Sequence, residues 1–134
     1  MNRTIVSSIV GLLAVSAMSV SAFAAAALKP VTVTGQLLDL NCYSSAGATG
    51  RGHGKVCGRK CLLSGAPAGI LVGHHAWTLD VNPKPLAPYV GLTIRVKGKE
   101  NVQDNVLLPT MIQVKEHGHW KTIKLIALFM PVGK

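Results

Sequence analysis

The sequence of 134 residues is short of acidic side chains and of aromatic rings. It contains only five Asp and Glu residues in total, and aromatic residues make up 4% of the chain. No two of the carboxylates form a recognisable acid/base pair, and the Gly-x-Ser-x-Gly, phosphate-loop and His-Glu-x-x-His motifs are absent. The aromatic residues are too few and too scattered to stack successive bases of a nucleic acid. The sequence therefore predicts a protein that is neither an enzyme nor a nucleic-acid-binding protein.

Cysteine is also scarce, with three residues at Cys42, Cys57 and Cys61. Their spacing contains no Cys-x2-Cys pair, which argues against a paired zinc knuckle and against a thioredoxin-like redox motif. An odd number of cysteines in an exported chain leaves two alternatives. Either one disulfide forms and one thiol stays free, or the three thiolates are held by a metal or another cofactor.

Residues 1–24 have the three parts of a secretory signal peptide. Arg3 lies near the amino terminus, the apolar stretch Ile5–Val20 follows, and Ala22–Ala24 forms a small-x-small cleavage site. The apolar stretch also approaches the roughly 20 residues of a membrane-spanning helix, but its serines and its small-residue end favour cleavage. We expect a periplasmic or secreted protein with no membrane span after cleavage, in which residues 25–134 form a single domain.

Positive charge is what the sequence has in excess, with a formal net charge of +9 at pH 7. Such a charge favours an anionic component of the cell envelope or an acidic exported protein as partner, although the cations also keep an apolar chain soluble. Three of them, Lys55, Arg59 and Lys60, lie beside the cysteines. We expect these neighbours to lower the pKa values of the thiols.

Alternation of apolar and polar residues predicts a mainly β protein. Gly35 is expected to mark a bulge or bend in the first strand, and Pro109 an edge or bulge near the end of the chain. We expect a polar loop, a short helix and one helical turn between the strands. The pattern favours a small OB-like antiparallel barrel of five to six strands with one short helix in a Cys/His-containing insertion. The expected strands are residues 31–40, 67–72, 76–81, 91–99, 106–115 and 120–129, the loop is 44–54, the helix 55–63 and the helical turn 86–89.

A candidate metal site follows from the spacing of His53, Cys57 and Cys61. If residues 53–63 are helical, these side chains lie at i, i+4 and i+8 on one helical face, and Cys42 joins them from the end of the preceding strand. Three thiolates and one imidazole suit tetrahedral zinc, and two or three thiolates suit cuprous copper. Asp39 is expected to accept a hydrogen bond from the imidazole or from a backbone amide.

A disulfide is the alternative use of the same residues. A bridge from Cys42 to Cys57 or Cys61 would tie the loop to the sheet and leave His53 exposed. A bridge between Cys57 and Cys61 is disfavoured, since side chains one helical turn apart lie roughly parallel and strain the bond.

Two further histidine pairs, His74-His75 and His117-Gly-His119, lie at predicted turns. Histidines at turns are more often solvated than bound to a metal. A second metal site would require the fold to bring the two turns together.

Several of these spacings together resemble a group of small exported bacterial proteins of unassigned function. The resemblance covers most of the chain after the signal peptide. It implies an exported OB-like domain with an inserted Cys/His segment, and it implies no activity and no ligand. The elements that carry it are Gly35-x3-Asp39-x2-Cys42-Tyr43, His53-x3-Cys57-x3-Cys61, Gly65-x-Pro67-x-Gly69 and the strand Gly91–Gly98.

Overall fold

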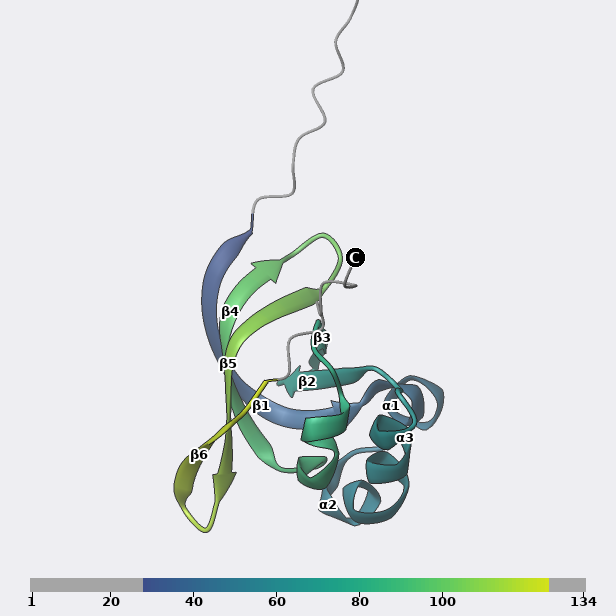
Figure 1. The fold of residues 1–134 in the computed structure, drawn as a ribbon. Coiled ribbons are helices and arrows are strands. Elements are labelled where there is room, and N and C mark those ends of the chain that lie inside the picture. Colours follow the sequence, from purple (N-terminus) through teal and green to yellow (C-terminus); the bar gives the residue numbers. More distant parts are fainter. Residues whose placement is uncertain (1–27, 126–134) are drawn as a thin grey trace, which may run out of the picture.

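The computed structural model describes residues 28–125 and is mainly β within that range (Figure 1). The expected signal peptide, residues 1–24, and residues 126–129 of the last expected strand lie outside the described residues. Five strands lie within two residues of their expected bounds, whereas the last strand, expected at 120–129, already ends at Ile123 within the described residues. The six strands are β1 (Lys29–Asp39), β2 (Ala68–Val72), β3 (His75–Leu79), β4 (Thr93–Asn101), β5 (Val106–Glu116) and β6 (His119–Ile123).

The strands form one sheet in the order β3-β2-β1-β4-β5-β6, with antiparallel pairing between neighbours. In addition, β3 and β5 pair in parallel, with Thr78 opposite Val106 and Leu79 opposite Leu107. The pairings therefore run from β1 through β2, β3, β5 and β4 back to β1. Strand β1 curves strongly and serves two partners, β4 along its first part and β2 along its last (Figure 1).

Glycine at position 35 lies where β1 changes partner. The register of β1 does not shift there, so the expected bulge is absent and only the bend is found. A side chain at this position would collide with the backbone carbonyl of Leu71 on β2. At Pro109 a bulge is present as expected, because the register between β4 and β5 shifts between Lys97 and Gly98.

The core follows the alternation of the sequence. On β4 and β5 the buried residues Ile94, Val96, Ile112 and Val114 alternate with more exposed neighbours. The connection between β3 and β4 contains the 3-10 helix η2 (Lys84–Tyr89), which confirms the expected helical turn and buries Leu86 against the core.

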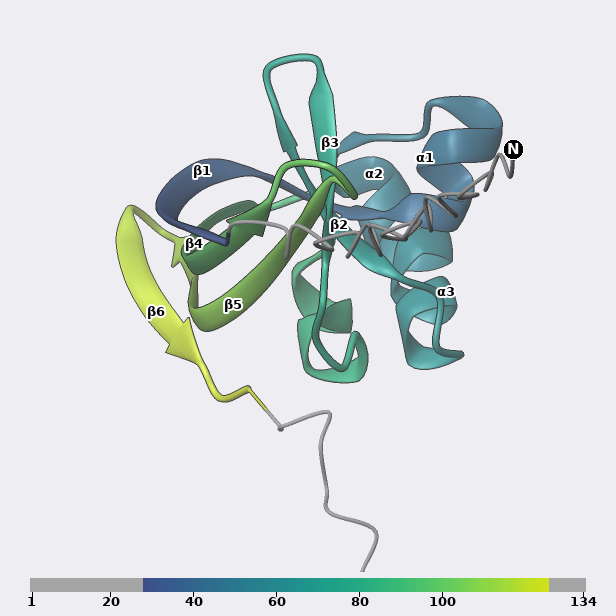
Figure 2. The ribbon, with the colours of Figure 1, turned by 90° about the horizontal axis from the view of Figure 1, so that it is seen from above.

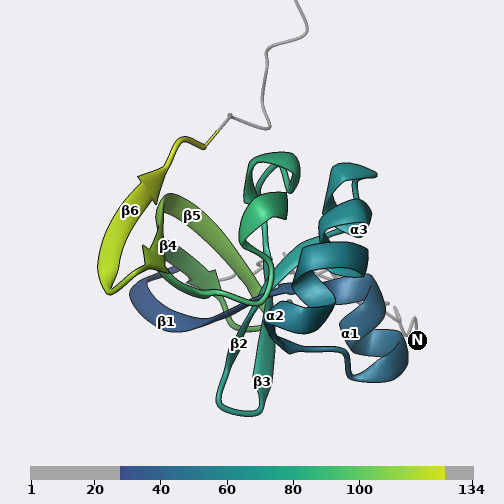
Figure 3. The same ribbon diagram turned by 90° about the horizontal axis from the view of Figure 1, so that it is seen from below.

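The insertion between β1 and β2 is more helical than the sequence predicted. It consists of α1 (Leu40–Ala46), α2 (Gly50–His53), the π-helical turn η1 (Gly54–Gly58) and α3 (Arg59–Leu63). The expected loop 44–54 is therefore wrong at both ends, and the single expected helix is replaced by three short α-helices and a π turn. Together they lie on one side of the molecule, opposite β6 (Figures 2 and 3). No helix among residues 28–125 is long and apolar enough to cross a membrane.

Candidate metal centre

Asp39, the last residue of β1, joins the sheet to the helical insertion. Its side chain is buried, and its Oδ1 accepts hydrogen bonds from the backbone N–H groups of Asn41 at 3.1 Å and Cys42 at 3.3 Å. An aspartate in this position caps the amino-terminal end of a helix, which explains why α1 begins immediately after the strand. The expected position of Cys42 at a strand end is therefore wrong, because Cys42 lies in the first turn of α1.

The other carboxylate oxygen of Asp39 faces the imidazole of His53. Asp39 Oδ2 lies 3.1 Å from His53 Nε2. This contact orients the imidazole, and a ring nitrogen of His53 is one of the possible ligand atoms grouped with the sulfurs of Cys42 and Cys57.

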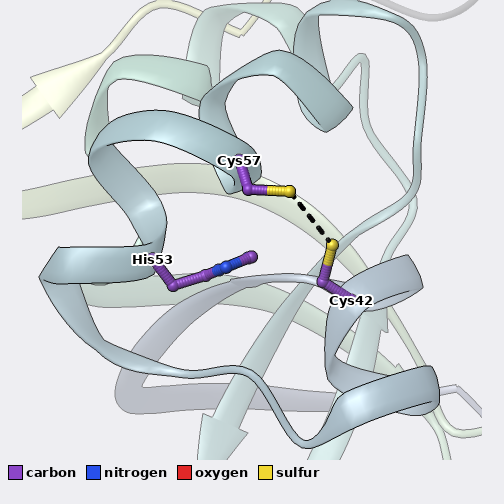
Figure 4. A group of neighbouring side chains, drawn as sticks. All are labelled: Cys42, His53 and Cys57. Atoms are coloured by element: carbon purple, nitrogen blue, oxygen red, sulfur yellow. Dashed lines mark hydrogen bonds between the residues drawn. The ribbon is translucent and has the colours of Figure 1, made fainter.

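Cys42 is the sulfur donor common to the whole site. Its Sγ lies 3.6 Å from that of Cys57 and 3.8 Å from that of Cys61. Figure 4 shows Cys42, His53 and Cys57 converging from three directions. Ligand atoms of these three residues all lie within 4.8 Å of one another. A second group, formed by Asp39, Cys42 and Cys61, meets the same limit, so the four predicted ligands lie close enough to hold a metal ion.

The π turn changes how the insertion presents its ligands. A regular α-helix would stack His53, Cys57 and Cys61 along one face, but η1 adds about one residue to the turn between them. His53 and Cys57 still share one group, whereas Cys61 falls into the other group with Asp39. The single helical face predicted from the sequence is therefore wrong in detail, although the four residues that it named do lie close together. Single π turns occur frequently at functional sites.

Two buried glycines let the insertion lie close to the body of the protein. A Cβ at Gly54 would collide with the carbonyl of Val90. At Gly58 it would lie 2.7 Å from Cγ1 of Val90 and 3.3 Å from Nε2 of His53. The absence of a side chain at Gly58 therefore makes room for the imidazole as well as for the core.

Polar contacts supply most of the remaining anchorage. The guanidinium of Arg51 donates 2.9 Å hydrogen bonds to the carbonyls of Pro88 and Val90, and the side-chain oxygen of Gln36 accepts from Gly50 N–H at 3.0 Å. Leu62 is the one large apolar side chain between residues 40 and 66 that is fully buried. The insertion thus has little apolar core of its own, so a bound ion or a cross-link would add to its stability.

Cys42 and Cys61 do not have the lowered thiol pKa values expected from the neighbouring cations. The carboxylate of Asp39, and then the hydrogen-bonded thiol of Cys57, raise the pKa of Cys42 far above its usual range. Burial is the main cause that raises the pKa of Cys61. Lys55, Arg59 and Lys60 are exposed at the surface, whereas Asp39 is in contact with the site. The protonated thiol is therefore favoured at Cys42 and Cys61, and a cation that binds these two sulfurs must displace their protons.

Burial alone would raise the pKa of Asp39. Hydrogen bonds from the Cys42 thiol, from His53 and from the N–H groups of Cys42 and Asn41 outweigh it and hold this pKa below its usual value. Asp39 is therefore a carboxylate at neutral pH, and its negative charge lies beside the sulfur donors.

The two other histidine pairs are not part of this centre. His75 Nε2 lies 3.1 Å from the side-chain oxygen of Asn105, and its ring meets Trp77 edge-on at 4.6 Å between centroids. His117 occupies a left-handed turn, with φ of 48°. Within residues 28–125, neither pair belongs to a group that could hold a metal ion.

Comparison of the chain with models of protein families, with curated proteins and with solved structures found no match. The function proposed for the chain therefore rests on the geometry of the site. Sequence reasoning missed that Asp39 itself lies among the sulfur donors. A partial signal was present in the sequence, because Asp is one of the residues preferred at the amino-terminal cap of a helix.

Proposed function

We propose that this protein is an exported binding protein for a thiophilic metal ion, copper or zinc, and that it acts by binding rather than by catalysis. Its ligands are Cys42, Cys57, Cys61 and His53, with Asp39 holding the imidazole. The observation that carries the proposal is the position of the Cys42 sulfur 3.6 and 3.8 Å from two other thiols, beside an imidazole already oriented by a buried carboxylate.

The sulfur separations support a shared ion more than a disulfide. Two thiolates bound to one tetrahedral zinc ion at about 2.3 Å lie about 3.8 Å apart. A disulfide requires about 2.05 Å between the sulfurs. All three cysteines are free thiols in the described chain, and both separations are close to the metal-bridged value.

The donor chemistry restricts the ion to soft and borderline metals. Two or three thiolates are the ligands that cuprous copper prefers, and three thiolates with one imidazole form a common structural zinc site. Export of the protein, which rests on residues 1–24, adds weight to copper. His53 distinguishes the two ions, because a thiolate-only copper site needs no imidazole whereas a four-coordinate zinc site does.

The proposed scaffold is a small OB-like barrel. Two arms of paired strands start from β1, one through β2 to β3 and the other through β4 to β5. The pairing of β3 with β5 joins these arms into a ring of five strands, which supports this proposal. The metal-binding insertion then occupies the β1–β2 connection at one end of this ring, with η2 next to it.

Metal and thiol content of protein purified from its native compartment test this proposal together. We expect close to one equivalent of copper or zinc per chain by elemental analysis, and three free thiols after denaturation and chelation without reductant. One free thiol and no bound metal would instead support a disulfide-stabilised envelope module, and would contradict the proposed function.

Substitution of His53 then identifies the type of site. His53→Ala should weaken zinc binding at least tenfold and leave the domain folded, because the histidine side chain is only partly buried and is not part of the apolar core. His75→Ala is the matched control, since His75 lies outside both groups of donors. Cuprous copper binding that survives His53→Ala but fails in Cys57→Ser would assign a thiolate-only copper site.

A further inference from the structure

A second surface, on the outward side of β4, β5 and β6, carries a row of cations. The inward side of these strands is set by the buried residues Ile94, Val96 and Val114. The residues between them point the other way, and cross-strand pairing places them side by side. We define the outer cationic face as Arg95, Lys97 and Lys99 of β4, Lys115 of β5 and Trp120 of β6.

An aromatic ring orients the charged groups at one end of this face. The guanidinium carbon of Arg95 lies 4.1 Å from the centroid of the Trp120 ring, and the ammonium nitrogen of Lys115 lies 6.0 Å from it. A guanidinium stacked on an indole keeps its in-plane N–H groups free for an oxyanion. Among the described residues, Arg95 has neither a hydrogen-bonded partner nor an ion pair through its side chain.

No acidic side chain of residues 28–125 neutralises the outer cationic face. Glu100 and Glu116 alternate with the outward residues and so belong to the inward side of their strands. Glu116 also forms a salt bridge with Lys121, with 3.6 Å between Oε2 and Nζ. Asp80 and Asp104 lie outside the strands, and Asp39 is buried in the metal centre. The cations of this face are therefore uncompensated within the part of the chain that the structure describes.

The geometry points to a linear polyanion as the ligand of this face, and we propose that it binds a polymer of repeated phosphate groups. Alternate residues of a strand are about 6.7 Å apart, so the three cations of β4 follow one another on the same face at a regular spacing. Such a row can contact successive charges of a linear polymer, and each contact releases a counterion from the polymer.

A membrane surface fits the same face less well. Binding at a bilayer interface requires large apolar side chains that project from the charged surface. The exposed large apolar residues of the described chain are Leu28, Val56, Leu63 and Val102, and none lies on this face. Trp120 itself is half-buried under Arg95.

Binding of inorganic polyphosphate to the purified chain tests the proposal, measured by equilibrium titration at several salt concentrations. We expect the triple variant Arg95→Gln, Lys97→Gln, Lys99→Gln to bind at least tenfold more weakly. The slope of log affinity against log salt should fall by about two, since each lost phosphate contact is worth about 0.7 on a single-stranded polymer.

A matched control removes the same charge elsewhere. Lys55→Gln, Arg59→Gln, Lys60→Gln also exchanges one arginine and two lysines, all exposed. They belong to η1 and α3, and α3 lies on the side of the molecule opposite β6 (Figure 3). We expect this variant to bind polyphosphate like the parent. Equal losses in both triple variants would show that binding follows net charge alone and would overturn the proposal.

Two further measurements test whether the row of cations itself binds and whether the ligand is a polymer or a membrane. Lys97→Gln, Lys99→Gln leaves the contact between Arg95 and Trp120 intact, and it should still weaken binding severalfold if the folded row of cations is responsible. Tighter binding of the parent to vesicles containing anionic phosphatidylglycerol than to polyphosphate, at equal phosphate concentration, would overturn the polymer in favour of a membrane. Neither result depends on metal content, so failure here leaves the proposed metal centre untouched.

Discussion

Replacement of Asp39 by alanine should show how strongly one carboxylate holds the insertion to the sheet. This side chain has two tasks in the structure. Oδ1 caps α1 by accepting hydrogen bonds from Asn41 and Cys42, and Oδ2 holds the imidazole of His53 at 3.1 Å. Alanine removes both contacts and leaves the imidazole without its orienting partner.

The expected cost follows from these two contacts. Loss of a helix cap costs about 0.5–2 kcal/mol, and loss of a hydrogen bond to a charged group costs about 1.5–3 kcal/mol. Asp39→Ala should therefore lower the free energy of unfolding by about 2–5 kcal/mol. Asp39→Asn keeps an oxygen that can cap the helix, so we expect a cost of about 1–2 kcal/mol, mainly from the lost charge.

Urea unfolding of the metal-free protein at pH 7 measures these differences. Asp80→Ala is the matched control, because Asp80 is exposed and its replacement should change the free energy of unfolding by less than about 0.5 kcal/mol. If Asp39→Ala unfolds within about 0.5 kcal/mol of the parent, Asp39 does not hold the insertion in place and our description of the site is wrong.

Three further predictions concern the same region. Gly58→Ala should cost about 1–3 kcal/mol of unfolding free energy and weaken metal binding, because the added methyl group would lie 2.7 Å from a buried valine and 3.3 Å from the imidazole. The control Gly52→Ala meets no neighbour and should be neutral or stabilising. Unchanged metal affinity in Gly58→Ala would contradict this prediction. Leu62→Ala should lower the free energy of unfolding by about 2–5 kcal/mol, measured by thermal or urea unfolding. Leu63→Ala, at an exposed position, should lower it far less. Equal losses would show that burial of Leu62 does not hold the insertion to the core. The folded-state pKa of Asp39 is lowered, so its contribution to stability is complete above the unfolded pKa of about 3.9 and is lost as pH falls through the folded value. The difference in unfolding free energy between the parent and Asp39→Asn should therefore shrink as pH falls below about 4, and a difference that grows on acidification would have the wrong sign.

The strands were predictable because alternation is a local property of the chain. Residues 91–99 and 106–115 alternate apolar and polar side chains, and their positions agree with β4 and β5 to within two residues at each end. The pairing of β3 with β5 could not be predicted from the sequence, because a parallel contact of two residue pairs leaves no pattern in either strand.

The helical insertion was harder to predict for a physical reason. Residues 40–54 contain almost no large apolar side chains that would mark a helical face. Their helices depend on the cap provided by Asp39 and on the close approach of Gly54 to the backbone of Val90. Neither contact has a periodic signal, so the segment resembled a loop.

The site residues were found for a reason that did not depend on helix geometry. Cysteine and histidine are rare in this chain outside the turns, so their clustering in one segment predicted that these side chains lie together, even though the predicted helical face was wrong. The π turn was not predictable, because its extra residue comes from packing of Gly54 and Gly58 against the core.

Metal binding by the double variant Cys57→Ser, Cys61→Ser tests the central claim most directly. Cys42 is the sulfur common to both groups of donors, and this variant leaves it without either thiol partner while sparing His53 and the helix cap. Equilibrium dialysis of parent and variant against zinc, and against cuprous copper under reducing conditions, gives the stoichiometry. We expect one ion per chain for the parent and none for the variant, and full retention of the ion by the variant would contradict a thiolate metal centre in this insertion.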